Sequence, residues 1–452
     1  MATRFESAIT RFGSLFTDTD AGDSRAPGSP VGRVRVAGAL AFVCAFCIPV
    51  VATGQGLPPW IAVKPSPDDD GARSVLVRAR DEPLFTLPSS SSPRRGAAAK
   101  GARLPFYGRT PGPGCLRDWL LVGPTAWMCG DRAELSRDPP LPAGVDAQST
   151  SDGLPRDYYF VGPDGAFGYD QLGTAEDTKP VSSLEPSFSV AAVQIAKKGT
   201  GDPFALTTKG IWIPLRDLKR ARPLAFRGFE ISSGKLDRAW VVVDDAHRYE
   251  KANGRRLAGA NKRRFETITV LEVQTVKQRS WVRIDSNEWL DAADLALPRP
   301  ATRPPEARTD ERWIDVDLES QVLTAFEGDR PVFATLVSTG KGRGDEPTAT
   351  PRGTNRVWVK LHTTDMTNLE DEDARRYYAI EDVPWVMFFH KGVGLHGAFW
   401  HRSFGHVRSH GCVNLTPLDA ERLFHWAGPH LPAGWTAALP TDYDPGTLVR
   451  VR

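Results

Sequence analysis

Cysteine is scarce in this chain, with five residues among 452. Cys44 and Cys47 lie inside an apolar run, Cys115 and Cys129 lie near each other, and Cys412 stands alone in the C-terminal two-thirds. With a single thiolate near the C-terminus, a zinc site built from several cysteines is excluded there. An odd cysteine left over is instead typical of a free reactive thiol.

An excess of charge of either sign is also absent, since 57 Lys and Arg residues oppose 55 Asp and Glu residues. A balanced chain gives no reason to expect a nucleic-acid partner. The length is sufficient for several domains with separate cores. The 41 Gly and 37 Pro residues indicate many turns and linkers, which favours β-rich domains over helical bundles.

One apolar run, at 36–52, follows Arg33 and Arg35 near the N-terminus. Its length falls between the hydrophobic region of a signal peptide and a short membrane span. The run therefore predicts an exported protein of the cell envelope or periplasm, with 36–52 either a cleaved signal peptide or a retained inner-membrane anchor. The polar segment 1–35 before it predicts disorder. Cys44 lacks the small residues that precede a lipidated cysteine, so a lipoprotein is not expected.

Two segments rich in proline predict connections between domains. Residues 53–97 are rich in Pro, Ser and Asp and predict a flexible tether. Residues 297–310 predict an extended, semi-rigid linker and mark a domain boundary. A larger C-terminal domain is then expected over 311–452.

The region between these segments contains a weak internal repeat. Trp212 and Trp289 each begin a W-x4-D-L sequence, and Trp127 with Glu134-Leu135 is a looser copy. Alternating apolar runs before each copy predict short strands. The pattern resembles bacterial SH3-like domains, which accompany cell-wall enzymes and are thought to hold wall peptides or glycan. The resemblance implies three such units, at 98–145, 146–223 and 224–296, although any compact β-domain can carry this pattern.

Cys115 and Cys129 fall within the first of these units. In an oxidising compartment their close spacing predicts a disulfide, and two buried thiols are the alternative. Closing so short a loop would contribute roughly 3 kcal/mol.

Glycine and histidine gather around Cys412. A thiol reacts as thiolate, and a nearby imidazole such as that of His396 is the usual means of forming one. Gly397, Gly405 and Gly411 let the backbone approach the sulfur and leave N–H groups to face a developing oxyanion. We therefore predict a Cys/His acyl-transfer site. A buried, unreactive thiol and a zinc site formed with the neighbouring histidines are the alternatives.

These residues resemble the active-site motif of the L,D-transpeptidase (YkuD-type) catalytic domain. The resemblance implies that Cys412 is the acylated nucleophile, that His396 is its base, and that the Gly397 carbonyl orients the imidazole. It also implies roles for other members of the motif at 409–414. Ser409 and His410 belong to the turn before the nucleophile, and the N–H groups of Gly411 and Cys412 face the oxyanion. Expected substrate-binding residues are Trp400, Arg408, Asn414 and Tyr378.

Further elements extend the resemblance over roughly 312–452, through S-T-G at 338–340 and T-P-R-G at 350–353. Strands are expected from 312 to 337, with Asp315 and Asp317 on the solvent side of a half-buried strand. An exposed acidic loop is expected at 370–373. Thr416-Pro417 predicts the start of a helix that braces the Cys412 turn. The fold implied is a mainly β multidomain chain with a sandwich or barrel-like catalytic domain, preceded by small SH3-like barrels.

The function implied is that of a peptidoglycan L,D-transpeptidase and carbapenem target. A stem tetrapeptide would acylate Cys412 and then pass to an amine of a neighbouring stem, giving a 3→3 cross-link, with neither metal nor organic cofactor. Water as acceptor would make the enzyme an L,D-carboxypeptidase, and a protein lysine would make it a wall-protein ligase. A non-catalytic, wall-binding protein is the alternative of a different class.

Overall fold

The computed structural model describes residues 71–141, 149–369 and 377–452. The predictions for 1–35, for 36–52 and for the acidic run at 370–373 concern residues outside these ranges. Within them the chain is mainly β, as predicted, and its one α-helix is α2 (Pro417–Trp426). None of the helices in these ranges is long and apolar enough to cross a membrane.

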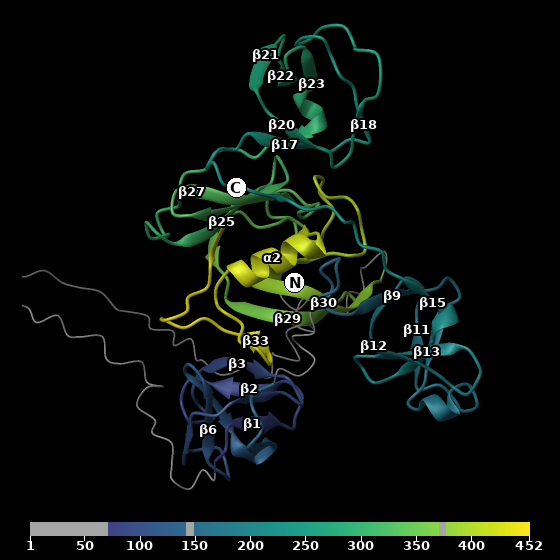
Figure 1. The fold of residues 1–452 in the computed structure, drawn as a ribbon, viewed down its shortest axis with the longest axis vertical. Helices are drawn as coiled ribbons and strands as arrows, with labels where there is room; N and C mark the ends of the chain where they lie inside the picture. Colours follow the sequence, from purple (N-terminus) through teal and green to yellow (C-terminus); the bar gives the residue numbers. More distant parts are fainter. Residues whose placement is uncertain (1–70, 142–148, 370–376) are drawn as a thin grey trace, which may run out of the picture.

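The C-terminal domain is built from two sheets with α2 beside them (Figure 1). One sheet contains the predicted antiparallel meander, closed by a parallel C-terminal strand. Its strands are β25 (Arg312–Asp317), β26 (Val322–Glu327), β27 (Arg330–Leu336), β28 (Gly353–Arg356) and β34 (Leu448–Val451). The other sheet contains β29 (Val359–Thr367), β30 (Ala379–His390), β31 (Val393–Gly397) and β32 (Val413–Leu415). Side chains from both sheets and from α2 form one shared core.

The helix α2 begins where the sequence predicts. Thr416 is its N-cap, with Oγ1 accepting the Asp419 N–H at 3.4 Å, and Pro417 occupies the first turn. Ala420, Leu423 and Phe424 recur at helical spacing and are buried in the shared core. The helix therefore packs behind β30, β31 and β32.

The prediction of a flexible tether over 53–97 is wrong for its C-terminal part. That part holds three strands: β1 (Ser74–Val77), β2 (Glu82–Phe85) and β3 (Arg94–Ala98). Val75, Val77 and Leu84 are buried in the core of the first β-unit. The serine run at 89–92 is the turn that joins β2 to β3. Turns and linkers share the same small polar residues, so composition alone does not separate them.

The W-x4-D-L repeat corresponds to a repeated local structure. In each unit a strand carrying the tryptophan is followed by one 3₁₀ turn (η) and a short strand. The three copies are β7 (Ala126–Cys129), η3 (Gly130–Arg132) and β8 (Ala133–Ser136); β14 (Trp212–Pro214), η5 (Leu215–Asp217) and β15 (Leu218–Arg220); and β23 (Glu288–Asp291), η6 (Ala292–Asp294) and β24 (Leu295–Ala296). The structure also joins Cys115 to Cys129 in a disulfide.

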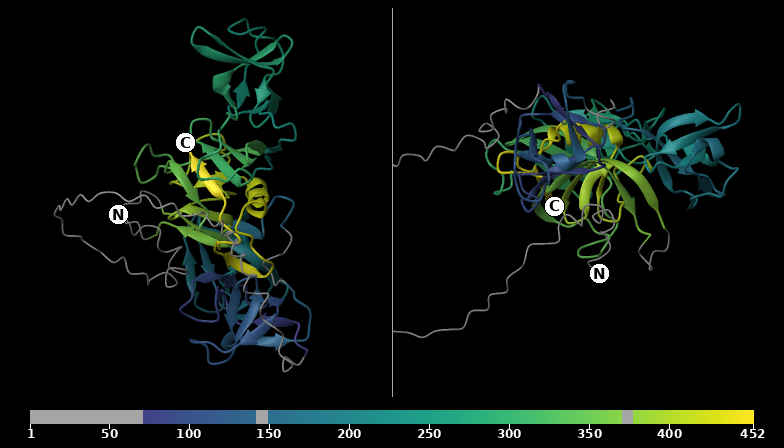
Figure 2. Two further views of the ribbon diagram at one scale, coloured as in Figure 1. Left: turned by 90° about the vertical axis from the view of Figure 1, so that its left-hand side faces the viewer. Right: turned by 90° about the horizontal axis from the view of Figure 1, so that it is seen from below.

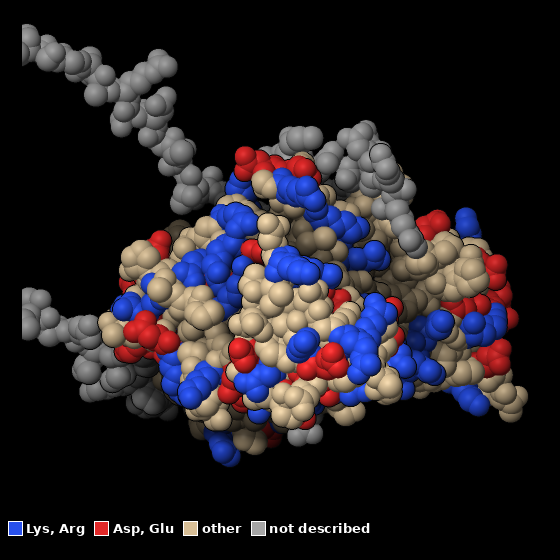
Figure 3. Space-filling view, turned by 90° about the horizontal axis from the view of Figure 1, so that it is seen from above, with Lys and Arg blue, Asp and Glu red and all other residues tan. Residues whose placement is uncertain are grey.

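Each N-terminal unit continues a sheet of the C-terminal domain. β3 of the first unit pairs with β33 (Trp435–Ala438), and β12 (Ser189–Lys197) of the second pairs with β30. β16 (Phe229–Glu230), which leads into the third unit, pairs with β27. The views in Figures 1 and 2 show the three units on different sides of the C-terminal domain. On the face drawn in Figure 3, basic and acidic side chains are interspersed.

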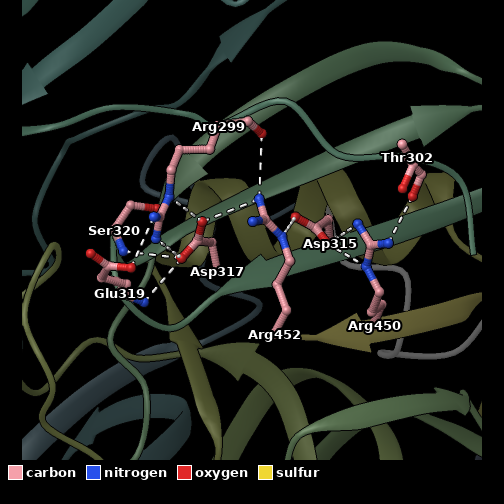
Figure 4. A network of polar contacts seen from close by, with 8 residues as sticks. All are labelled: Arg299, Thr302, Asp315, Asp317, Glu319, Ser320, Arg450 and Arg452. Atoms are coloured by element: carbon pink, nitrogen blue, oxygen red, sulfur yellow. Dashed lines mark hydrogen bonds and ion pairs between the residues drawn. The ribbon is translucent and has the colours of Figure 1, made fainter.

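Asp315 and Asp317 are not on a solvent face, so the expectation of a half-buried strand is wrong for them. Their exposed fractions are 1% and 3%. Arg450 of β34 and Arg452 just after it bind Asp315 at 2.7 and 2.8 Å, and Arg299 binds Asp317 through two hydrogen bonds of 2.7 Å (Figure 4). The alternation along β25 was predicted correctly. The linker residue Arg299 and two arginines near the C-terminus, none of them adjacent to β25 in sequence, cover the polar face.

Candidate active site

The predicted base lies on β31, and the predicted nucleophile directly precedes β32, the strand that runs parallel to β31. In the register of β31 and β32, Leu395 is opposite Val413, and His396 is opposite Asn414. Leu395 and Val413 point into the shared core, so His396 and Asn414 lie on the other face. Cys412 directly precedes β32, and its thiol contacts the backbone at Gly392 and Gly394, around the start of the strand that carries His396. The structure therefore brings Cys412 to the start of the β31–β32 pair that carries His396 and Asn414.

His396 is held as a neutral imidazole. Its side chain is 2% exposed, and Nδ1 lies 3.2 Å from the carbonyl oxygen of Gly397. Burial lowers the pKa of His396 to about 4, and the hydrogen bond with Gly397 opposes that shift only in part. With Nδ1 donating to the Gly397 carbonyl, Nε2 is the basic nitrogen. The indole of Trp400 stacks on the ring, with centroids 5.7 Å apart.

Cys412 is the one free cysteine among the described residues, and its side chain is 8% exposed. Burial raises the pKa of the Cys412 thiol to about 11, against a lowering by a hydrogen bond with the Gly394 backbone. Sγ lies 3.8 Å from the carbonyl oxygen of Gly392. At neutral pH the pair is thus a thiol beside a neutral imidazole. Such a pair loses the thiol proton to the base during attack, and it holds no thiolate beforehand.

The turn before Cys412 is tied by Ser409. The Ser409 hydroxyl donates to the Cys412 carbonyl oxygen and accepts the Gly411 N–H at 3.1 Å. Gly411 has φ +130, a conformation that favours glycine. Because its N–H is bound to Ser409, Gly411 does not offer the free oxyanion donor that we expected. The expectation for the Cys412 N–H remains a prediction.

The S-T-G and T-P-R-G elements lie against this turn. The carbonyl oxygen of Thr339 accepts the N–H groups of Arg408 and Ser409 at 2.9 and 3.0 Å. Thr350 Oγ1 accepts the Gly340 N–H at 2.8 Å and donates to the Gly411 carbonyl oxygen at 2.7 Å. The turn before Cys412 is therefore hydrogen-bonded to the loop between β27 and β28, near both ends of that loop.

The expected substrate-binding residues have different surroundings. Tyr378, just before β30, stacks on the exposed ring of His410 with centroids 5.9 Å apart. Trp400 stacks on His396, and the side chain of Arg408 is exposed. Asn414 is buried at 3% exposure and contacts another imidazole, that of His401.

His401 is a site residue that the sequence analysis missed. It was considered there only as one of the neighbouring histidines of a possible zinc site. Its side chain is 8% exposed and its Nε2 lies 2.9 Å from Asn414 Nδ2. Burial, with help from Arg408 and His396, lowers the pKa of His401 to about 3. The residue follows no strand or helix period, so no local signal indicated its position.

The histidines around Cys412 do not converge as metal ligands. Within the ranges that the structure describes, one group of potential ligands lies close enough to share an ion: Cys115, Cys129 and Asp131. The two thiols of that group are joined in the disulfide.

Two N-terminal units contact the loop that joins His396 to Cys412. The ring centroid of Tyr158 in the second unit lies 4.3 Å from the ring centroid of Phe399. In the third unit, the Val242 carbonyl oxygen lies 2.8 Å from His406 Nε2. A Cβ atom on Gly405 would meet Val242 Cγ1 at 2.6 Å, so only glycine fits this contact. No pattern in the sequence indicates these long-range contacts.

The arrangement of the turn, of His396 and of the surrounding strands agrees with a comparison of this chain with known protein families. Residues 311–451 match the L,D-transpeptidase catalytic domain (YkuD). This confirms the resemblance for the C-terminal domain, whereas the SH3-like resemblance of the other units stays a prediction. A search of curated proteins finds no match.

Solved structures of L,D-transpeptidases resemble the chain in part. The one from Xylanimonas cellulosilytica has 22% identity and a TM-score of 0.23, over 33% of this chain and 64% of that one. The catalytic domain from E. faecium has 25% identity and a TM-score of 0.24, over 32% and 100%. L,D-transpeptidase 3 from Mycobacterium tuberculosis has 16% identity and a TM-score of 0.25, over 38% and 78%. The chain thus spans less than two thirds of the first of these relatives.

Proposed function

We propose that this protein is a peptidoglycan L,D-transpeptidase that forms 3→3 cross-links through a thioester on Cys412. One observation carries the proposal: Cys412 directly precedes β32, His396 lies on the adjacent strand β31, and the Gly397 carbonyl orients the imidazole. The match of 311–451 to the catalytic-domain family supports the same chemistry.

Acylation uses the pair as nucleophile and base. Cys412 Sγ attacks the carbonyl carbon that joins the third residue of a stem tetrapeptide to its terminal D-Ala. His396 Nε2 accepts the thiol proton as the carbon–sulfur bond forms. The carbon–nitrogen bond then breaks, and His396 gives the proton to the departing amine of D-Ala. Backbone N–H groups near Cys412 stabilise the oxyanion between these steps.

Transfer to the acceptor reverses the proton movement. The side-chain amine of a diamino acid in a neighbouring stem attacks the thioester carbon. His396 accepts the amine proton and returns it to sulfur as the carbon–sulfur bond breaks. Water in place of the amine gives carboxypeptidase activity, and a protein lysine gives attachment of that protein to the wall.

We also propose an envelope location, with 36–52 as signal peptide or membrane anchor. In this proposal the three N-terminal units are SH3-like modules that hold wall peptides or glycan. Their repeated strand, 3₁₀ turn and strand support this assignment.

Intact-protein mass spectrometry tests the acyl-enzyme. The full chain, purified in mild detergent, is incubated with the carbapenem imipenem beside a Cys412→Ala variant. We expect an adduct of the drug's mass on the wild-type chain and none on the variant. A folded wild-type protein with a titratable thiol and no adduct would overturn the proposal and favour a wall-binding protein.

The acceptor is tested with purified disaccharide-tetrapeptide as donor and acceptor. A dimer lighter than two substrates by one D-Ala is the expected product. Tripeptide alone would show that water is the acceptor and that the enzyme is a carboxypeptidase.

A further inference from the structure

We propose that His401 positions the side-chain amide of Asn414 so that its N–H group points into the acylation site as a hydrogen-bond donor. The inference rests on the proposed function. It assigns His401 a positioning role and Asn414 a direct contact with the acyl donor.

Asn414 lies where a donor can reach the reacting groups. It is directly opposite His396 in the β31–β32 register, and Cys412 lies two residues before it, at the start of the same strand pair. Adjacent strands are about 4.8 Å apart, so the side chains of Asn414 and His396 are neighbours. Asn414 is 3% exposed, which removes water as its ordinary hydrogen-bond partner.

The contacts of His401 determine which of its nitrogens carries hydrogen. The Ser403 N–H donates to His401 Nδ1 at 3.1 Å, so Nδ1 acts as an acceptor and bears no hydrogen. Burial keeps the ring neutral. The hydrogen of the neutral ring is therefore on Nε2, which faces the Asn414 amide at 2.9 Å.

This tautomer in turn determines the orientation of the amide. A protonated Nε2 needs an acceptor, and in the Asn414 side chain only Oδ1 can accept. In the structure, Asn414 Nδ2 faces His401 Nε2, so two donors meet, and Asn414 Oδ1 is buried without a hydrogen-bond partner among the described residues. Rotating the Asn414 amide group by 180° exchanges its two terminal atoms. Oδ1 then accepts from His401, and Nδ2 takes the former position of the unpaired Oδ1. The N–H that results has no protein acceptor in the described ranges.

A carbonyl oxygen of the acyl donor is the acceptor that fits this N–H. During attack by Cys412 that oxygen gains negative charge, and a buried donor aimed at it stabilises the transition state more than the bound substrate. Such a donor also supplements the turn, where the Gly411 N–H is bound to Ser409.

Two substitutions separate positioning from packing. His401→Gln places a side-chain amide nitrogen near the Nε2 position and keeps a donor toward Asn414. His401→Asn fills only the Nδ1 position, keeping an acceptor for Ser403 and losing the donor. Asn414→Asp retains an acceptor for His401 and removes the N–H, and thermal unfolding shows whether each full-length variant is folded.

The readout is the imipenem acylation of the full chain, resolved into apparent affinity and maximal rate. We expect His401→Asn to lower the maximal rate about tenfold, Asn414→Asp to lower it by about 10², and His401→Gln to stay within about threefold of wild type. Equal rates for the Asn and Gln variants of His401 would overturn the inference. So would an unchanged rate in Asn414→Asp.

A second measurement does not depend on activity. Nitrogen-15 NMR of the imidazole is expected to show His401 protonated at Nε2 and bare at Nδ1. Hydrogen on Nδ1 would overturn the inference even if the enzyme is acylated normally. A wild-type chain that is not acylated at all would instead contradict the proposed function, with the NMR result still deciding the role of His401.

Discussion

At the scale of single residues, the proposed catalytic pair of Cys412 and His396 owes its protonation states to burial. Removal from water disfavours the charged form of each group, so the pKa of the thiol rises and that of the imidazole falls. Cys412 and His396 are consequently both neutral over the physiological range. This state protects the thiol from unproductive oxidation, because the thiolate is the reactive form.

The pH dependence of acylation follows from these two shifts. Because the pKa of His396 is lowered to about 4, the base remains available until the pH falls to that value. We expect the imipenem acylation rate of the full chain to be level around neutrality and to fall below pH about 5, as the imidazole takes up a proton. Rates measured between acidic and mildly alkaline pH test this. A midpoint near the ordinary histidine value would contradict the lowering of the His396 pKa by burial.

The buried carboxylates of β25 lead to a prediction on stability. Removing the Arg299 guanidinium takes two hydrogen bonds from the buried Asp317, which keeps Arg452 at 3.1 Å, so Arg299→Ala should lower the free energy of unfolding by about 2 kcal/mol. The matched control is Arg255→Ala, whose ion pair with Glu250 is exposed. Chemical denaturation compares the two variants. A loss no larger in Arg299→Ala than in the control would contradict the account.

Acid should weaken the same contact. Burial by itself raises the pKa of Asp317, but the hydrogen bonds and charges of Arg299 and Arg452 outweigh it, and the net pKa is lowered. A lowered carboxyl pKa adds stability that is complete above the unfolded-state value and is lost as the pH falls through the folded-state value. Arg299→Ala should therefore flatten the decline of stability in acid.

At the scale of elements, α2 supports the strands that carry the site. It lies against β30, β31 and β32, and its N-cap Thr416 directly follows β32. The last turn is held at its carbonyl end, where the buried Lys360 Nζ donates to the carbonyl oxygens of Phe424 and Ala427. Burial lowers the pKa of Lys360 to about 7, and its protonated form interacts favourably with the helix dipole.

The cap of α2 can be tested with a conservative pair of substitutions. Thr416→Ala removes the oxygen that accepts the Asp419 N–H and should cost about 1 kcal/mol of stability. Thr416→Ser keeps that oxygen and should change stability much less. Urea unfolding of the full-length variants provides the comparison. Equal losses would mean that packing of the methyl group, and not the cap, stabilises the helix start.

At the scale of the whole molecule, the C-terminal domain is completed by residues far from it in sequence. Trp385 donates to the Gly153 carbonyl oxygen at 2.7 Å, and both oxygens of Asp419 accept the Gly228 N–H at 3.0 Å. Trp435 is buried in the core of the first unit. The N-terminal units are therefore structural parts of the domain that carries Cys412.

Removal of the first three strands, which lie in or next to the segment predicted as a tether, tests this dependence. A chain that begins at residue 99 lacks β1, β2 and β3, so β33 loses its strand partner and Trp435 loses part of its core. We expect a lower melting temperature and weaker imipenem acylation than in a chain that begins at residue 71. Circular dichroism and mass spectrometry measure both. Identical behaviour of the two chains would show that the first three strands are dispensable.

The sequence by itself determined the features that depend on neighbouring residues. The Cys412 motif, the Thr416 cap, the β25–β27 meander and the Cys115–Cys129 pairing each follow from residue types at short spacing. Such signals report strand period, capping and loop length, which are properties of a few consecutive residues.

Only the tertiary structure decided which distant groups meet. It placed residues 74–98 in a β-unit, buried Asp315 and Asp317 under arginines from the linker and chain end, and brought His401 to Asn414. It also placed the second and third units in contact with the loop between His396 and Cys412. Burial and hydrogen bonding of these groups depend on partners that are separated from them by whole strands or loops, which no local pattern encodes.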